Sequence, residues 1–201
     1  MKKQVVVIHG GDAFDTYQEY VSFLKHWKID FTDYQNQRTG WKKTLGKALG
    51  ARYEIIAPDM PNKINAKYAE WKIWFKKFIP HLRNGVVFVG HSLGGIFLAK
   101  YLSEHSFPKK IKATFLIAAP YGTARHESLA DFILKKSLAK FAVQGGSVVL
   151  YHSADDKIVP VSNVRHYQKA LPGARMVIFK NRGHFNQKTF PELVRAIKKL
   201  S

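Results

Sequence analysis

The sequence contains no cysteine among its 201 residues, which excludes disulfide bonds, thiolate nucleophiles and cysteine metal ligands. It has no His-Glu-x-x-His motif and no compact cluster of histidine and acidic residues, so we expect no metal ion. Without a Gly-x-Gly-x-x-Gly motif or a Gly-Lys-Ser/Thr ending, we expect no cofactor. No apolar run is long enough to cross a bilayer, and the start of the chain lacks a signal-peptide pattern, so we expect a cytoplasmic protein.

Acidic residues are scarce: 14 aspartates and glutamates stand against 33 lysines and arginines, and the formal net charge is +19. Such a charge attracts nucleic acid and anionic lipid non-specifically at low salt. The basic residues occur in small groups throughout the sequence, such as Lys42-Lys43 and Lys109-Lys110, and form no single dense run. We therefore expect a solvated basic surface and no specific nucleic-acid partner.

Short strand-like runs alternate with helical patterns along the chain. Six runs rich in β-branched and aromatic residues predict strands, at 4–9, 53–57, 86–90, 113–118, 147–152 and 175–180. Helical patterns lie at 16–27, 41–49, 68–79, 93–105, 127–143, 161–171 and 191–200. This alternation predicts an α/β fold, a doubly wound, mostly parallel six-stranded sheet with helices on both faces. The length and a hydrophobic content of 46% suit a single domain, 1–201.

A serine between glycines is the candidate nucleophile. Gly90-His91-Ser92-Leu93-Gly94 follows a predicted strand and precedes a helical pattern, which is the context of the nucleophile elbow of α/β-hydrolases. In such an elbow a sharp turn lifts the serine hydroxyl above the sheet, and the glycines let the strand and the helix approach closely. We therefore predict that Ser92 is the nucleophile of a serine hydrolase.

A serine nucleophile needs a base, and the base needs an acid that orients it. Asp155 and Asp156 follow the strand at 147–152, and His184 follows the last strand. The carboxyl ends of parallel strands share one edge of the sheet, so these side chains are expected near Ser92. The order Ser, Asp, His along the chain is also that of α/β-hydrolases. We predict His184 as the general base and one of the two aspartates as its partner.

Two backbone N–H groups are candidates for the oxyanion hole. One belongs to Leu93, the residue after the nucleophile, and the other to Gly11, in the loop after the first strand. The loop His9-Gly10-Gly11-Asp12 has two other interpretations, a plain glycine-rich connection and a phosphate-binding loop. The elbow motif favours the oxyanion role.

The motifs together resemble those of the small α/β serine hydrolases of the retinoblastoma-binding-protein-nine type. The similarity extends over essentially the whole chain and is carried by Gly90-His91-Ser92, Ser153-Ala154-Asp155-Asp156 with Pro160, and Gly183-His184-Phe185. It implies that the second aspartate, Asp156, completes the catalytic triad and that Asp155 shapes the loop. Residues 29–50 fit this pattern least well, and we expect them to flank the mouth of the site or to lengthen a connection.

Residues 120–146 leave room for one or two helices only, so we expect an open site without a large cap. An open site favours a carboxylesterase that acts on short-chain or small aromatic esters. Phe14, Tyr17, Tyr121 and Phe185 are candidates for its aromatic walls, with plain packing as the alternative. Two other functions remain: an amide or peptide hydrolase with the same triad, which the resemblance also suggests, and a non-catalytic scaffold that binds a polyanion or a protein.

Overall fold

The structure is a computed structural model that describes residues 1–200 except 30, 32–39, 123–127 and 135–136. Its centre is a sheet of six parallel strands in the order β2-β1-β3-β4-β5-β6. The strands are β1 (Lys3–Ile8), β2 (Tyr53–Ile56), β3 (Val86–His91), β4 (Ile111–Ile117), β5 (Ser147–Ser153) and β6 (Arg175–Phe179). The predicted six-stranded α/β fold is confirmed, and every strand boundary lies within two residues of its prediction.

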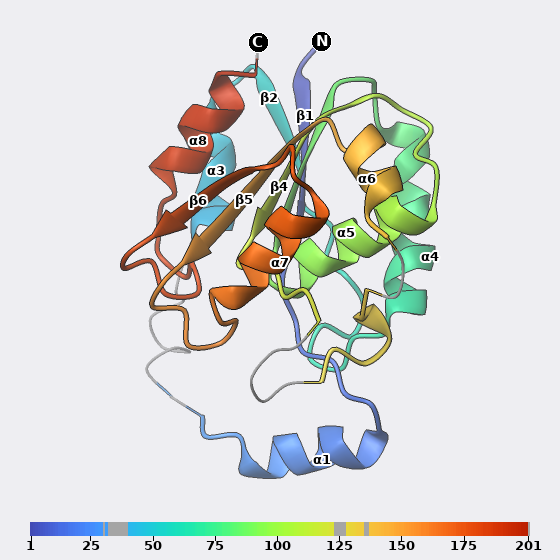
Figure 1. Cartoon of the computed structure of the whole chain (residues 1–201), viewed down its shortest axis with the longest axis vertical. Helices are drawn as coiled ribbons and strands as arrows, with labels where there is room; N and C mark the ends of the chain where they lie inside the picture. The colour runs from blue at the N-terminus through green and yellow to red at the C-terminus, as the bar shows by residue number, and fades with distance from the viewer. Residues whose placement is uncertain (30, 32–39, 123–127, 135–136, 201) are drawn as a thin grey trace.

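Helices cover both faces of the sheet (Figure 1). The helices α3 (Trp41–Leu49) and α8 (Pro191–Lys198) pack on one face. The other face carries α4 (Tyr68–Phe78), α5 (Leu93–Glu104), α6 (Ala139–Gln144), α7 (Ser162–Ala170) and the 3-10 turns η1 (Ile79–His81) and η2 (Ala130–Phe132). The helix α1 (Tyr17–His26) buries none of its residues and lies beyond the end of the sheet. None of the described helices is long and apolar enough to cross a membrane.

The central strands are apolar on both sides because both faces of the sheet are covered. In β1, Val6 and Ile8 belong to the core under α4 and α5, while Val5 and Val7 belong to the core under α3 and α8. All four side chains are at most 2% exposed. The side-chain alternation of a strand therefore supplies two cores at once.

The helix predicted at 127–143 is not continuous. Its described part contains η2, the short helix α6 and irregular chain between them. The Nζ of Lys100, on α5, donates hydrogen bonds to the carbonyls of Asp131 (2.5 Å) and Ile133 (3.0 Å). The carboxylate of Asp131 accepts from the backbone N–H of Tyr68 and so caps the start of α4. Tertiary hydrogen bonds thus replace the helical ones that the local pattern predicts.

Candidate active site

Ser92 stands between β3 and α5 in a strained backbone conformation. Its φ is 53° and its ψ is −124°, a region that residues other than glycine rarely adopt. The backbone N–H of Ser92 donates to the carbonyl of Ile117 at the end of β4 (2.8 Å). The chain turns here from a buried strand directly into a buried helix, so the serine stands at the carboxyl edge of the sheet.

The glycines of this turn are required by close backbone contacts. A Cβ atom on Gly90 would lie 2.5 Å from the carbonyl oxygen of Gly94 and 2.7 Å from the Cα of Gly95. A Cβ atom on Gly94 would collide with the carbonyl oxygens of Ile8 and His9, at the end of β1. These contacts confirm that the glycines let the helix start close to the two strands.

His184 and Asp156 are joined by a hydrogen bond although 28 residues separate them. The Nδ1 of His184 lies 2.9 Å from the Oδ2 of Asp156. The other carboxylate oxygen, Oδ1, accepts the backbone N–H groups of Ile158 and Val159, each at 2.9 Å. Asp156 is buried, with 8% of its surface exposed, and the three hydrogen bonds hold its carboxylate in one orientation. An ionised carboxylate only accepts, so Nδ1 of His184 carries the proton and Nε2 is free to act as a base.

Asp155 has a different set of partners. Its Oδ1 accepts the hydroxyl of Ser153 (2.5 Å) and the backbone N–H of Gly183 (2.9 Å). These hydrogen bonds, first that from Ser153, lower the pKa of the Asp155 carboxyl. Ser153 also accepts the N–H of Arg182 (2.9 Å). Asp155 therefore ties the loop after β5 to the loop after β6, whereas Asp156 contacts the imidazole of His184.

His91, the residue before the serine, packs against His184. The two ring centroids are 4.9 Å apart, and Nε2 of His91 lies 2.8 Å from the carbonyl oxygen of His184. A carbonyl only accepts, so Nε2 of His91 carries the hydrogen. Its Nδ1 is buried and has no partner among the described residues. This contact places His91, and with it the start of the elbow, directly against the loop that carries His184.

Three histidines near the site, His9, His91 and His152, have lowered pKa values, and we call them the three interior histidines. Burial is the largest cause of the lowered pKa in each. His9 accepts the backbone N–H of Met60 (2.8 Å), and His152 donates to the carbonyl of Val159 (2.8 Å). Their lowered pKa values favour the neutral imidazole at pH 7, and their hydrogen bonds link the loops around the site.

Trp41, at the start of α3, holds the loop that carries His184 through two hydrogen bonds. The indole Nε1 of Trp41 donates to the carbonyl of Phe185 (2.9 Å), and its backbone N–H donates to the carbonyl of Gln187 (2.9 Å). Sequence reasoning assigned no such role to residues 29–50. The available signal was the spacing of Trp41, Leu45 and Leu49, which marks one buried helix face.

The predicted oxyanion donors line a small hollow together with the serine. Its volume is about 10 Å³. Its lining consists of Gly11, Ala13, Ser92, Leu93, Pro120, Ser128, Leu129 and Val159. A Cβ atom on Gly11 would collide with the carbonyl oxygen of Lys63, so the chain fits closely here only with glycine. The structure thus brings Gly11 and Leu93, which are far apart in the sequence, to the same hollow as Ser92.

Two charged side chains beside the site have shifted pKa values. Asp12 follows Gly11 in the same loop, and burial raises the pKa of its carboxyl, while the charge of His184 acts in the opposite direction. Lys42, in the first turn of α3, has its pKa lowered to about 8 by burial. Its charge also contributes to the lowered pKa of His91. Sequence reasoning identified neither side chain as part of the site.

The prediction that Phe185 lines the substrate site is wrong. Its side chain is 0% exposed, and its ring packs against those of Phe179 (5.6 Å) and Phe190 (5.2 Å). Its φ of 56° turns the chain directly after His184. The ring therefore anchors the loop of His184 in the core and cannot contact a substrate.

The other aromatic candidates lie outside the lining of the hollow. Phe14 is half-buried and packs against Tyr20 and Phe23, while Tyr17 is 69% exposed on α1. Tyr121 is half-buried and stacks on His166 of α7 (5.6 Å), with its N–H donated to the amide oxygen of Asn163. Within the described residues, no group of three or more histidine and acidic side chains is arranged to hold a metal ion.

A family model described as "Serine hydrolase" matches residues 31–196. The chain is similar to the serine hydrolase RBBP9 of Rattus norvegicus, with 26% identity over 165 residues, which is 80% of this chain and 84% of that protein.

Solved structures with the same fold include the product of the ydeN gene of B. subtilis. That structure has 20% identity and a TM-score of 0.78, covering 99% of this chain and 98% of that one. A putative YdeN-like hydrolase from Pectobacterium atrosepticum has 12% identity and a TM-score of 0.62, covering 99% and 90%. At these identities the two structures support the fold alone.

Proposed function

The chain belongs to the serine hydrolase family, and we propose that it cleaves carboxylic esters with small acyl groups through an acyl-enzyme on Ser92. The observation that carries this proposal is the hydrogen bond of 2.9 Å between His184 and the buried Asp156. It leaves Nε2 of the imidazole available at the edge of the sheet where the elbow presents the serine hydroxyl.

The proposed reaction has two halves. The Oγ of Ser92 attacks the ester carbonyl carbon while Nε2 of His184 takes the hydroxyl proton. The tetrahedral intermediate collapses, the bond to the leaving oxygen breaks, and His184 returns the proton to the departing alcohol. Water then attacks the acyl-enzyme with His184 again as the base, which releases the carboxylic acid and restores the serine.

Three further groups stabilise the charges that develop in this reaction. The N–H groups of Gly11 and Leu93 donate to the oxyanion, and their presence at the hollow beside Ser92 supports that role. Asp156 stabilises the imidazolium that forms when His184 accepts the proton. Because two backbone N–H groups fix its Oδ1, its Oδ2 stays aligned with the imidazole throughout the cycle.

The size of the hollow supports a preference for small acyl groups. The hollow has room for about one water molecule. Its lining residues include Leu93 of the elbow and the apolar residues Leu129 and Val159. A long acyl chain would have to lie along the surface outside this hollow and would gain little from burial.

A substrate series tests the proposal. We expect kcat/KM to fall at least about tenfold from p-nitrophenyl acetate to p-nitrophenyl octanoate, the loss that about 1.4 kcal/mol produces. Aminoacyl arylamides should be hydrolysed far more slowly than the acetate ester. Ser92→Ala should abolish turnover, while Ser106→Ala, at an exposed serine, should not change it. Faster cleavage of the arylamides would identify a peptide hydrolase, and ester turnover by Ser92→Ala would refute the acyl-enzyme.

A further inference from the structure

Basic residues that are scattered in the sequence gather at one edge of the sheet. All six strands are parallel, so all begin at the edge opposite the candidate active site, and α8 ends there as well (Figure 1). Ten lysines and arginines lie in the segments that begin the strands or end α8. We call them the basic edge: Lys2, Lys3, Arg52, Arg83, Lys109, Lys110, Lys112, Arg175, Lys198 and Lys199.

Acidic side chains are few in the segments of the basic edge. The same segments contain one carboxylate, that of Glu54, whose Oε2 lies 2.6 Å from Nη2 of Arg83. Acidic residues occur instead in the loops at the opposite edge, among them Asp12, Asp155 and Asp156. Ten cations near one carboxylate give this edge a strongly positive potential.

The centre of the basic edge is hollowed. The hollow has a volume of about 600 Å³. Its basic lining residues are Lys2, Lys3, Arg83, Lys109 and Lys112, and none of its lining residues is acidic. The guanidinium of Arg83 is fixed there by Glu54 and by the carbonyl of Lys2 (3.0 Å). The positive groups thus surround a concave surface that is open to an anion.

From this arrangement we propose that the basic edge binds double-stranded nucleic acid through its phosphates, independently of sequence. Strands in a sheet lie about 4.8 Å apart, so the row from β2 to β6 extends over about 24 Å. A row of cations of this length matches the linear array of phosphates along a duplex. Because contacts to phosphates read no base edges, binding of this kind does not distinguish sequences.

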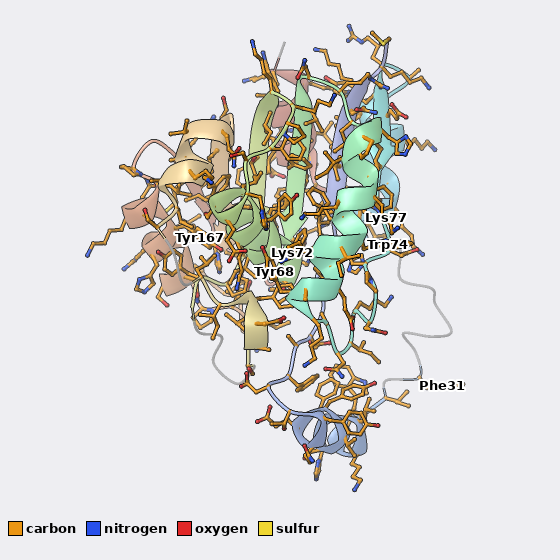
Figure 2. All side chains as sticks on the ribbon, turned by 90° about the vertical axis from the view of Figure 1, so that its right-hand side faces the viewer. Phe31, Tyr68, Lys72, Trp74, Lys77 and Tyr167 are labelled. Carbon is orange, nitrogen blue, oxygen red and sulfur yellow. The ribbon has the colours of Figure 1, made fainter. Side chains whose placement is uncertain are left out.

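The position of the exposed aromatic residues favours a duplex over a membrane or a single strand. Tyr17, Trp27 and Phe31 are each more than half exposed and lie on or beside α1, at the other end of the molecule (Figures 1 and 2). In the described segments of the basic edge, no aromatic side chain is exposed to that degree. Interfacial lipid binding uses apolar anchors, and single-strand binding uses aromatic rings that stack on bases.

Two variants of equal charge test the proposal. In the edge variant, Lys2, Lys3, Lys109 and Lys110 are all changed to glutamine. In the control variant, four exposed lysines at the opposite end of the molecule are changed in the same way: Lys25, Lys28, Lys180 and Lys188. Both variants lose four charges, so only the position of the loss differs.

Binding is measured by fluorescence anisotropy with two labelled 20-base-pair duplexes of unrelated sequence, between 100 and 300 mM KCl. The slope of log K against log salt should be shallower by up to about 3.6 in the edge variant, since each of the four lost phosphate contacts removes about 0.9. At 150 mM KCl the edge variant should bind at least about thirtyfold more weakly, and the control variant within about threefold of the original protein. Both duplexes should bind equally.

Four results would overturn the proposal: equal losses in the two variants, discrimination between the duplexes, tighter binding to a single-stranded oligonucleotide, or tighter binding to phosphatidylserine vesicles. Hydrolysis of p-nitrophenyl acetate should be the same in both variants and serves as a check on folding. Because the basic edge and Ser92 lie at opposite ends of the sheet, loss of one activity should leave the other intact.

Discussion

Exchange of Asp156 for asparagine should lower kcat for ester hydrolysis by about 10⁴ while leaving the fold intact. The Oδ1 of Asp156 accepts the backbone N–H groups of Ile158 and Val159. In Asp156→Asn the amide oxygen takes this position, because only an acceptor fits there. The NH₂ group then faces Nδ1 of His184, 2.9 Å away, where the carboxylate oxygen was.

The consequence is a change of tautomer in the imidazole. An NH₂ group only donates, so Nδ1 of His184 must accept and the ring proton moves to Nε2. A protonated Nε2 cannot take the proton of Ser92, and no carboxylate remains to stabilise an imidazolium. A 10⁴-fold loss corresponds to about 5.5 kcal/mol of transition-state stabilisation.

Asp155→Asn is the matched control, with the same change of group one residue away. An amide oxygen at position 155 can still accept the hydrogen bonds from Ser153 and Gly183, so we expect less than about a tenfold loss. The assay is steady-state kcat with p-nitrophenyl acetate, accompanied by thermal melting of each variant. A larger loss in Asp155→Asn, or a loss below tenfold in Asp156→Asn, would refute this assignment of the two aspartates.

Three further changes test other parts of the structure. Burial lowers the pKa values of the three interior histidines in the folded protein, so the unfolded chain binds more protons as the pH falls below 6.5. Urea melts should therefore show the free energy of unfolding falling from pH 6.5 to 5, by up to about 1.4 kcal/mol per pH unit for each histidine. An unchanged urea midpoint would contradict this. Gly90→Ala should lower the free energy of unfolding by about 1–3 kcal/mol through its collision with the elbow, whereas Gly173→Ala, with open space around it, should not. Lys100→Met removes the ammonium that donates to the carbonyls of Asp131 and Ile133, and should lower the free energy of unfolding by about 1–3 kcal/mol for each carbonyl in a urea melt. A loss below about 1 kcal/mol in total would show that water replaces the ammonium.

The strands and the elbow could be predicted because their signals are local. A buried parallel strand needs a short apolar run, and the turn at Ser92 needs glycines within two residues on either side. The continuous helix at 127–143 was predicted wrongly because Lys100, more than 30 residues away in sequence, donates hydrogen bonds to the carbonyls of Asp131 and Ile133. Phe185 was misassigned because its neighbour His184 faces the site while its own ring turns into the core.

The charge distribution shows the same limit of sequence reasoning. Lys2-Lys3, Lys109-Lys110 and Lys198-Lys199 are separate pairs in the sequence, and no run of basic residues marks a surface. The parallel topology returns the chain to the same edge before every strand, so these pairs become neighbours only in the folded protein. The supporting contacts of His91 and Trp41 with the loop of His184 likewise depend on segments about 90 and 144 residues apart.

Reaction with a fluorophosphonate probe tests the central claim, that His184 and Asp156 activate the hydroxyl of Ser92. Such a probe reacts with an activated serine without requiring knowledge of the substrate. We predict a single label, which peptide mapping places on Ser92 and which disappears in Ser92→Ala and His184→Ala. A label on another residue, or undiminished labelling of His184→Ala, would contradict the account.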